Sequence, residues 1–272
     1  LYKLLAVNND CYKTQRTIIP KGVMWHSTGA NNPKLKRYVG PDDGRLGINI
    51  FKNYWNRPKV AKCVHAFIGK LKDGSVATYQ TLPWNHRGWH AGSGRLGTAN
   101  NTHISFEICE NNLKSKDYAM AVYKEAVEVT AYLCKMFKLD PLGKNVIIDH
   151  AEGARLGIAS NHGDVLHWFG RYGITLQKIR DDVAQVMQTP ESKPDPSAST
   201  YTVKHGDSPW SIAAKELGDG RRYKEIEQLN GLTGTYYIYA GQVLKLPSSS
   251  TPNTPTSYKA QVTARAGLNY RS

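Results

Sequence analysis

The chain has 272 residues, of which 40% are hydrophobic and 21% are charged, enough for one sizeable core and at least one smaller module. No apolar run approaches the roughly 20 residues that a membrane helix needs, and the first residues have too short an apolar core for a secretory signal. The formal net charge of +14 favours a polyanionic partner. Because the basic residues are scattered and form no nucleic-acid-binding motif, an acidic polymer such as a cell-wall polysaccharide fits as well as a nucleic acid.

Strand and helix patterns alternate along roughly the first 188 residues and predict an α/β body. Short β-rich runs between turns predict strands at 22–26, 64–71, 75–80, 103–109 and 145–150. The Asp73-Gly74 turn predicts a hairpin between the second and third of these strands. Apolar residues at helical spacing predict packing helices at 117–137 and 175–188.

Two segments rich in Pro, Ser and Thr, 189–200 and 248–257, divide the chain. Because they contain almost no large apolar residue, they cannot bury enough surface to offset their ordering entropy, and we interpret them as linkers. The chain is therefore expected to comprise a body at 1–188, a module at 201–247 and a short tail at 258–272.

The four cysteines form no CxxC pair. Three of them, Cys63, Cys109 and Cys134, lie in apolar runs, where a buried thiol packs like a small hydrophobic side chain. We therefore interpret these three and Cys11 as free thiols of a protein from a reducing compartment.

Histidines and acids at strand ends are candidates for a metal site. His26 and His150 each end an apolar strand, where open α/β sheets place ligand-handling side chains. Glu107 interrupts an apolar strand, so its carboxylate must be paired, hydrated in a cleft or held near a metal. A hydrolytic zinc needs three protein ligands, an open position for water and a nearby base. The candidate ligands are His26, His150 and one of Asp164, His162 and His167, with Glu107 as the base.

Spacing alone does not decide between a metal site and structural histidines. The chain has no HExxH motif, so no single helix fixes two ligands. Strand-end and loop histidines that bond to backbone or water remain the alternative at this point.

The chain resembles the zinc-dependent N-acetylmuramoyl-L-alanine amidases of the type 2 family, found in phage endolysins and bacterial autolysins. The resemblance covers roughly residues 1–187 and rests on four motifs in the family's order: "GVMWHSTGA", "GWHAGSG", "ISFEICEN" and "DHAEGARLGIASNHGDVLHWF". It implies the α/β fold of these amidases and of peptidoglycan recognition proteins, a mixed sheet flanked by helices. It also implies a peptidoglycan hydrolase, which uses Zn²⁺-activated water to cleave the amide bond between N-acetylmuramic acid and L-alanine.

Carried over position by position, the resemblance implies the metal ligands His26, His150 and Asp164 and the catalytic residues Glu107 and His162. Many members have a lysine at the position of His162, which leaves open whether this residue stabilises an oxyanion, binds the metal or is a bystander. We expect His167 to be structural, beside Trp168. The alternative function is a peptidoglycan recognition protein without catalysis, but such relatives commonly lack a competent third ligand, whereas Asp164 is one.

Aromatic side chains near the centre are expected to line the substrate groove, because their rings stack on sugar or peptide faces. These expected substrate-binding residues are Trp84, Trp89 and His90, and core packing of at least one of the two tryptophans is the alternative. Outside the site we expect His65 and His103 as core histidines, and Tyr38, Asp42 and Asp43 as loop residues.

Residues 201–247 resemble a LysM repeat, in the opening "YTVKHGDSPWSIA", the central "LNGL" and the closing "AGQVLKLP". The resemblance implies a small βααβ domain that binds glycans containing N-acetylglucosamine. Its expected core residues are Trp210, Ile212, Leu229 and Leu244, and the expected glycan contacts are Gly206, Asp207 and Asn230.

The tail at 258–272 resembles the first strands of a bacterial SH3-like wall-binding domain and stops where such a domain has barely begun, so we expect a truncated chain. The expected partners are peptidoglycan glycan strands, stem peptides and anionic wall polymers, with no nucleic acid and no membrane. We expect a monomer that is made in the cytoplasm without an evident signal peptide and acts on the cell wall. A phage endolysin would be released through a partner pore, and an autolysin would be extracellular.

Overall fold

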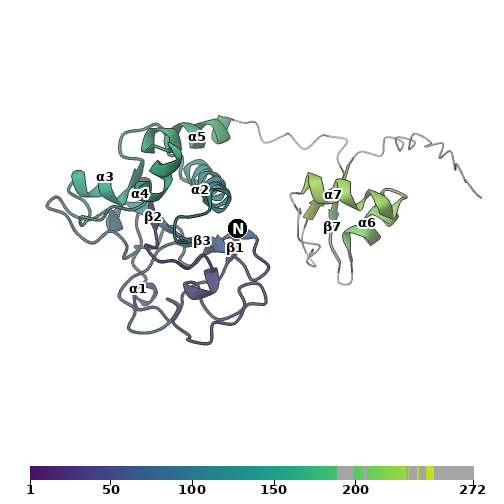
Figure 1. Cartoon of the computed structure of the whole chain (residues 1–272), viewed down its shortest axis with the longest axis horizontal. Helices are drawn as coiled ribbons and strands as arrows, with labels where there is room; N and C mark the ends of the chain where they lie inside the picture. The colour runs from purple at the N-terminus through teal and green to yellow at the C-terminus, as the bar shows by residue number, and fades with distance from the viewer. Residues whose placement is uncertain (189–198, 205–206, 231, 233–237, 239–242, 248–272) are drawn as a thin grey trace, which may run out of the picture. The chain divides into compact units, whose positions relative to one another are not determined.

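The computed structural model describes residues 1–188, 199–204, 207–230, 232, 238 and 243–247. It divides the chain into two compact units, Leu1–Glu191 and Ser192–Ser272 (Figure 1). The expected linker at 248–257, the SH3-like tail at 258–272 and Gly206 lie outside the described residues. Among the described residues, none of the helices combines the length and the hydrophobicity that a membrane span requires.

The first unit is built on a six-stranded mixed sheet with the strand order β1-β4-β3-β5-β2-β6. Its strands are β1 (Tyr2–Lys3), β2 (Gly22–Ser27), β3 (Ala66–Lys70), β4 (Val76–Gln80), β5 (His103–Ile108) and β6 (Ile147–Asp149). β2 runs parallel to both β5 and β6, and β3 runs parallel to β5, whereas β3 and β4 form the expected antiparallel hairpin. The carboxyl ends of β2, β3, β5 and β6 therefore meet at one edge of the sheet.

Helices and short helical turns cover this sheet. They are α1 (Asp10–Lys13), η1 (Leu35–Arg37), η2 (Ala99–Asn101), α2 (Lys116–Phe137), α3 (His150–Arg155), α4 (Leu166–Phe169), η3 (Gly170–Tyr172) and α5 (Leu176–Gln188). The main core lies between the sheet and α2 and α5, and Figure 1 shows these two helices together on one side of the unit. α2 begins after Ser115, whose side chain accepts a hydrogen bond from the Tyr118 backbone N–H. The α/β fold with a mixed sheet flanked by helices is confirmed.

Cys11 and Cys63 form a disulfide, so the interpretation of these two residues as free thiols is wrong. They lie 52 residues apart, and no short motif marks them as a pair. Cys63 also exchanges two backbone hydrogen bonds of 3.1 Å with Trp89. The disulfide thus joins α1 to a segment that runs beside Trp89. Disulfides form and persist in oxidising environments, which argues against the expected reducing compartment.

The other two cysteines behave as the sequence predicts. Cys109 and Cys134 are free and buried, and both pack among apolar side chains of the first unit. Burial raises the pKa of both thiols, which keeps them protonated and unreactive.

The second unit has the expected βααβ order. Its elements are β7 (Thr200–Thr202), α6 (Pro209–Glu216), η4 (Gly220–Arg222), α7 (Tyr223–Leu229) and β8 (Val243–Lys245), and β7 pairs with β8 in antiparallel orientation. The core consists of Tyr201, Val203, Ile212, Ala213, Ile226, Leu244 and Leu246.

Two residues expected in this small core are exposed. The exposed fraction is 57% for Trp210 and 45% for Leu229, so their assignment to the core is wrong, whereas Ile212 and Leu244 are fully buried. Trp210 precedes Ile212 by two residues in α6, which turns it about 200° around the helix from the buried side. Its ring lies against the backbone of Gly220, where a Cβ atom would be 2.3 Å from the indole.

Candidate metal centre

Three side chains from separate segments converge at the carboxyl edge of the sheet. His26 is the penultimate residue of β2, and His150 directly follows β6 as the first residue of α3. Trp25 pairs with Asp149 across these parallel strands. The residues that follow them, His26 and His150, therefore lie side by side. Asp164 approaches from the loop between α3 and α4.

The ligand atoms of these three residues lie close enough together to hold one metal ion, all within 4.8 Å of one another. His26 Nδ1 lies 3.2 Å from His150 Nδ1 and 3.2 Å from Asp164 Oδ2, and His150 Nδ1 lies 3.4 Å from Asp164 Oδ1. Tetrahedral ligands about 2.0–2.1 Å from a zinc ion are about 3.3 Å apart. Two imidazole nitrogens at this distance either share the hydrogen of one Nδ1–H group or both bind one metal ion. The residues present therefore fit a zinc ion.

The other ring nitrogen of each histidine has a partner that fixes the ring. His26 Nε2 lies 3.0 Å from His90 Nδ1, and His150 Nε2 lies 3.3 Å from Ser160 Oγ. If Nδ1 of each ring serves the metal, Nε2 carries the proton and donates these two bonds. The Ser27 backbone N–H donates to Asp164 Oδ2 at 3.2 Å and holds the carboxylate. Both tautomers are thus set by the surrounding residues.

Electrostatic coupling favours a cation at this point. Burial alone would lower the pKa of His26, but the hydrogen bond to Asp164 and the charge of Glu107 outweigh burial and raise it. Burial alone would raise the pKa of Asp164, yet His26 lowers it to about 2. Burial, followed by the charge of His26, lowers the pKa of His150 to about 4.

Glu107 stands next to this group without belonging to it. It is the register partner of His26 on the neighbouring parallel strand β5. Its Oε2 atom is buried and has no hydrogen-bond partner among the described residues. Burial, opposed by the charge of His26, raises the pKa of Glu107 to about 7. A carboxyl group with a pKa near neutrality suits a residue that must both take up and release a proton.

A cavity of about 230 Å³ opens beside Glu107. It is lined by Thr28, Ala30, Arg37, Tyr38, Trp55, Lys62, Val64, Trp89, His90 and Glu107. Trp89 and His90 line this cavity, and their contact with substrate stays a prediction. Trp84 is not among the lining residues; it is buried in the main core, and its ring lies 6.5 Å from that of Tyr132 in α2. This packing agrees with the alternative that at least one of the two tryptophans belongs to the core.

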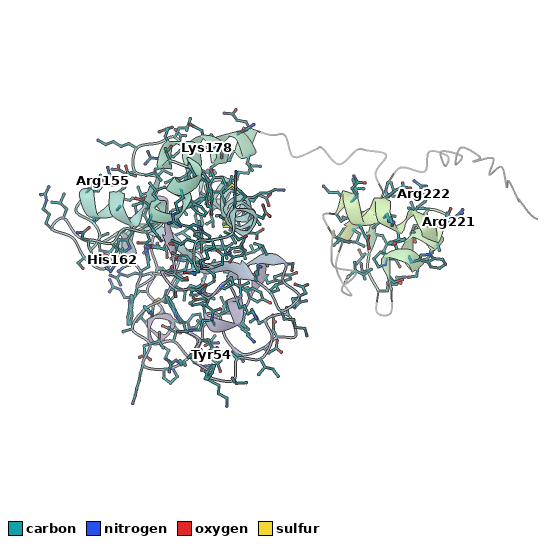
Figure 2. The ribbon with its side chains drawn as sticks, viewed as in Figure 1. Tyr54, Arg155, His162, Lys178, Arg221 and Arg222 are labelled. Carbon is teal, nitrogen blue, oxygen red and sulfur yellow. A yellow bond between two sulfur atoms is a disulfide. The ribbon has the colours of Figure 1, made fainter. Side chains whose placement is uncertain are left out.

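Sequence reasoning missed the other wall of the cavity, formed by Arg37, Tyr38, Trp55 and Lys62. Tyr38 is not a loop residue outside the site, because it lines the cavity and its ring stacks on Phe67 with 5.4 Å between centroids. Figure 2 shows Tyr54, the neighbour of Trp55, on the side of the unit opposite Lys178 of α5. The long irregular stretch between η1 and β3 was a usable signal, since such loops in compact domains are usually functional.

The remaining histidines have separate roles. His162 is exposed, with Nδ1 3.0 Å from Ser160 Oγ and its ring centroid 4.7 Å from that of His150, outside the group of three (Figure 2). His167 Nε2 contacts Glu110 Oε1 at 3.2 Å. His65 and His103 each donate to a backbone carbonyl, of His86 and Asn145 respectively. These contacts agree with structural roles for His65 and His103.

The loop acids Asp42 and Asp43 and the expected glycan contacts Asp207 and Asn230 all make internal hydrogen bonds. Asp43 accepts a 2.5 Å hydrogen bond from the Tyr79 hydroxyl, and Asp42 accepts from the backbone of its own turn. In the second unit, Asp207 accepts from the Tyr201 hydroxyl and the Lys204 N–H. Asn230 bonds through its side chain to Ile226 O and to both backbone groups of Lys245. The side chains of Asp207 and Asn230 therefore hold the fold of this unit.

Comparison with known proteins identifies both parts of the chain. The model of the N-acetylmuramoyl-L-alanine amidase family Amidase_2 matches residues 14–164, and that of the LysM domain matches residues 201–247. The chain therefore belongs to the N-acetylmuramoyl-L-alanine amidase family and carries a LysM domain.

Individual relatives share parts of the chain. It is 29% identical to the N-acetylmuramoyl-L-alanine amidase XlyB of Bacillus subtilis over 182 residues, which are 66% of this chain and 54% of XlyB. It is 55% identical to the N-acetylmuramoyl-L-alanine amidase sle1 of Staphylococcus epidermidis over 49 residues, 18% of this chain and 14% of sle1. The crystal structure of the Staphylococcus aureus hydrolase AmiA with its ligand aligns at 19% identity and a TM-score of 0.43, covering 65% of this chain and 76% of AmiA. The chain thus spans about half the length of XlyB and less of sle1.

Proposed function

We propose that the protein hydrolyses the amide bond between the lactyl group of N-acetylmuramic acid and the L-alanine of the stem peptide. In this proposal His26, His150 and Asp164 hold a Zn²⁺ ion. The observation that carries it is the convergence of three ligand atoms, all within 4.8 Å of one another, beside the buried carboxyl group of Glu107. Membership in the amidase family and the names of the relatives support the same reaction.

The residues around the metal centre have different roles in the proposed reaction. A bound zinc ion would polarise the scissile carbonyl and acidify water. Glu107 lines the cavity and takes the proton of the attacking water, and it then passes this proton to the leaving nitrogen of L-alanine. His162, exposed beside His150, donates a hydrogen bond to the oxygen that becomes negative. Trp89 and His90 contact the substrate in the cavity.

We further infer that the LysM domain binds glycan strands that contain N-acetylglucosamine, near Asp207 and Asn230. Tethering to the strands would raise the local concentration of cleavable bonds around the catalytic unit. The net charge of +14 favours additional attraction to anionic wall polymers. In this proposal the protein acts as a monomer on the cell wall.

Mass spectrometry of the products released from purified peptidoglycan tests the reaction. The native protein is incubated with the walls as prepared, with a chelator, and with chelator followed by Zn²⁺. We expect free stem peptides beginning with L-alanine in the first and third reactions and none in the second. Walls that stay intact with the protein still bound would overturn the hydrolase and favour the recognition protein instead.

A further inference from the structure

The cavity beside Glu107 contains two cations that make no salt bridge with any residue the structure describes. Arg37 donates one guanidinium N–H to the Asn53 carbonyl, and its guanidinium carbon lies 5.3 Å from the centroid of the Tyr38 ring. The Lys62 ammonium group lies 4.5 Å from the centroid of the Trp55 ring. Glu107 is the acid among the residues that line the cavity, so the cavity has an excess of positive charge.

The backbone at Trp55 and Lys62, in one wall of the cavity, is held in place by a buried side chain and by the disulfide. The side-chain amide of the buried Asn9 donates to the backbone carbonyls of Trp55, at 2.9 Å, and Lys62, at 3.1 Å. The residue after Lys62 is Cys63, which the disulfide fixes to Cys11. Positions that are held in this way suit selective binding, because little ordering remains to be done when a ligand arrives.

His90 and Glu107 line the same cavity from the catalytic side. Glu107 Oε2 is buried without a hydrogen-bond partner among the described residues. His90 Nδ1 is engaged by His26 Nε2, so His90 serves the histidine group rather than an anionic ligand. The donors that the cavity offers are therefore those of Arg37 and Lys62, which together match an anionic, oxygen-rich group.

We propose that Lys62 and Arg37 select stem peptides with a free carboxylate on the second residue. This inference rests on the proposed function. Glu107 protonates the leaving nitrogen, so the cavity next to it receives the peptide that starts with L-alanine. The lactyl side of the bond has no charge, whereas the second residue of the stem, a D-isoglutamate, has a carboxylate that an amidated stem replaces by a neutral amide. Charged side chains with several donors distinguish these two groups.

Binding of the released peptide tests the proposal without catalysis. The full-length, zinc-loaded protein is titrated calorimetrically with L-alanyl-D-isoglutamyl-L-lysine and with the matching D-isoglutamine peptide. We expect the carboxylate peptide to bind about 10- to 100-fold more tightly, as for hydrogen bonds to charged groups. Equal affinities, or no binding of either peptide, would overturn the proposal.

Two variants test whether Lys62 causes the preference for the carboxylate peptide. Lys62→Met keeps the aliphatic stem over Trp55 and removes the charge, so we expect it to bind both peptides equally. Lys70→Met is the matched control, because Lys70 also lies over an aromatic ring, 5.1 Å from that of Tyr118, but does not line the cavity. A Lys62→Met variant that keeps the preference would contradict the inference. With soluble muramoyl peptides as substrates, Lys62→Met should raise KM for the carboxylate stem and leave kcat unchanged.

Failure of this inference is distinguishable from failure of the proposed function. A protein that releases stem peptides from walls but binds the two peptides equally is an amidase without this selectivity. A protein that releases no peptide while zinc is bound refutes the amidase, whatever its preference between the two peptides.

Discussion

His26 and Glu107 are register partners on the parallel strands β2 and β5. Register partners present their side chains on the same face of a sheet, so the pairing brings a candidate ligand and a candidate base together while leaving Glu107 outside the group of ligands. The strand register thus places the candidate base directly beside a candidate ligand.

Glu107→Gln is expected to keep zinc and lose turnover. The amide has nearly the shape of the carboxyl group but cannot carry a proton from water to the leaving nitrogen, so kcat should fall by about 100-fold or more. Zinc content, measured by elemental analysis of the purified variant, should stay at one ion per chain. A variant with native turnover would remove Glu107 from the mechanism.

Asp164→Ala is expected to lose both zinc and activity. Removing the carboxylate leaves two ligands and takes away the partner of the His26 imidazole. Competition with a chromogenic chelator should show a fall in zinc affinity of at least about 100-fold. His167→Ala is a suitable control, because His167 contacts Glu110 and none of the three candidate ligands. Unchanged affinity in Asp164→Ala would mean that the metal binds elsewhere.

His90→Ala should lower the zinc affinity of the site, although His90 is not itself a candidate ligand. His26 then loses the acceptor that lies 3.0 Å from its Nε2 atom, and loss of such supporting contacts typically costs about 10- to 100-fold in metal affinity. The same chelator competition measures this effect. Trp89→Phe, which alters the cavity wall without touching a candidate ligand, should leave zinc affinity unchanged. Equal losses in both variants would indicate general damage to the cavity.

The Cys11–Cys63 disulfide should be visible both chemically and in stability. Alkylation of the denatured, unreduced protein is expected to label the two free thiols, Cys109 and Cys134, and reduction should expose all four. Cys11→Ser with Cys63→Ser should lower the free energy of unfolding by about 2–5 kcal/mol, as loss of a native disulfide typically does. Denaturant titration measures this change, and four labelled thiols before reduction would rule out the bond.

Asp43 should make stability depend on pH. Burial alone would raise the pKa of its carboxyl group, but hydrogen bonds from Tyr79, Arg45 and Leu46 outweigh burial and lower it. A carboxyl group with a lowered pKa in the folded state stabilises the fold above its unfolded pKa, near 4, and this contribution is lost as pH falls through the folded pKa.

The matching experiment compares the wild type with Asp43→Asn. The wild type should be about 1–2 kcal/mol more stable at pH 6, with the difference shrinking below pH 4. Tyr79→Phe should remove part of the same pH dependence. A difference that stays constant from pH 6 to pH 3 would contradict the assignment.

Regular elements of the fold were predictable because their patterns are local. The helical spacing of apolar residues predicts α2 and α5 within one residue at each end, and the Asp73-Gly74 turn predicts the β3–β4 hairpin. Candidate ligands at the ends of β2 and β6 follow from the rule that such ends carry functional groups.

The cavity and the disulfide depend on long-range contacts that no local pattern reveals. Lys62 and Trp55 lie in an irregular segment whose position is set by Asn9, far away in the sequence. Trp84 and Trp210 show the same limit: both are large and apolar, but the surrounding backbone leaves only Trp84 buried. Residue type did not distinguish between them.

The disulfide also links two walls of the cavity covalently. Cys63 directly follows Lys62 in the chain and exchanges two backbone hydrogen bonds with Trp89. Its disulfide to Cys11 therefore anchors both the wall that carries Lys62 and the wall that carries Trp89. A chain still in a reducing compartment would hold this junction by hydrogen bonds alone. Oxidation would then add the covalent link that fixes the two walls of the cavity to each other.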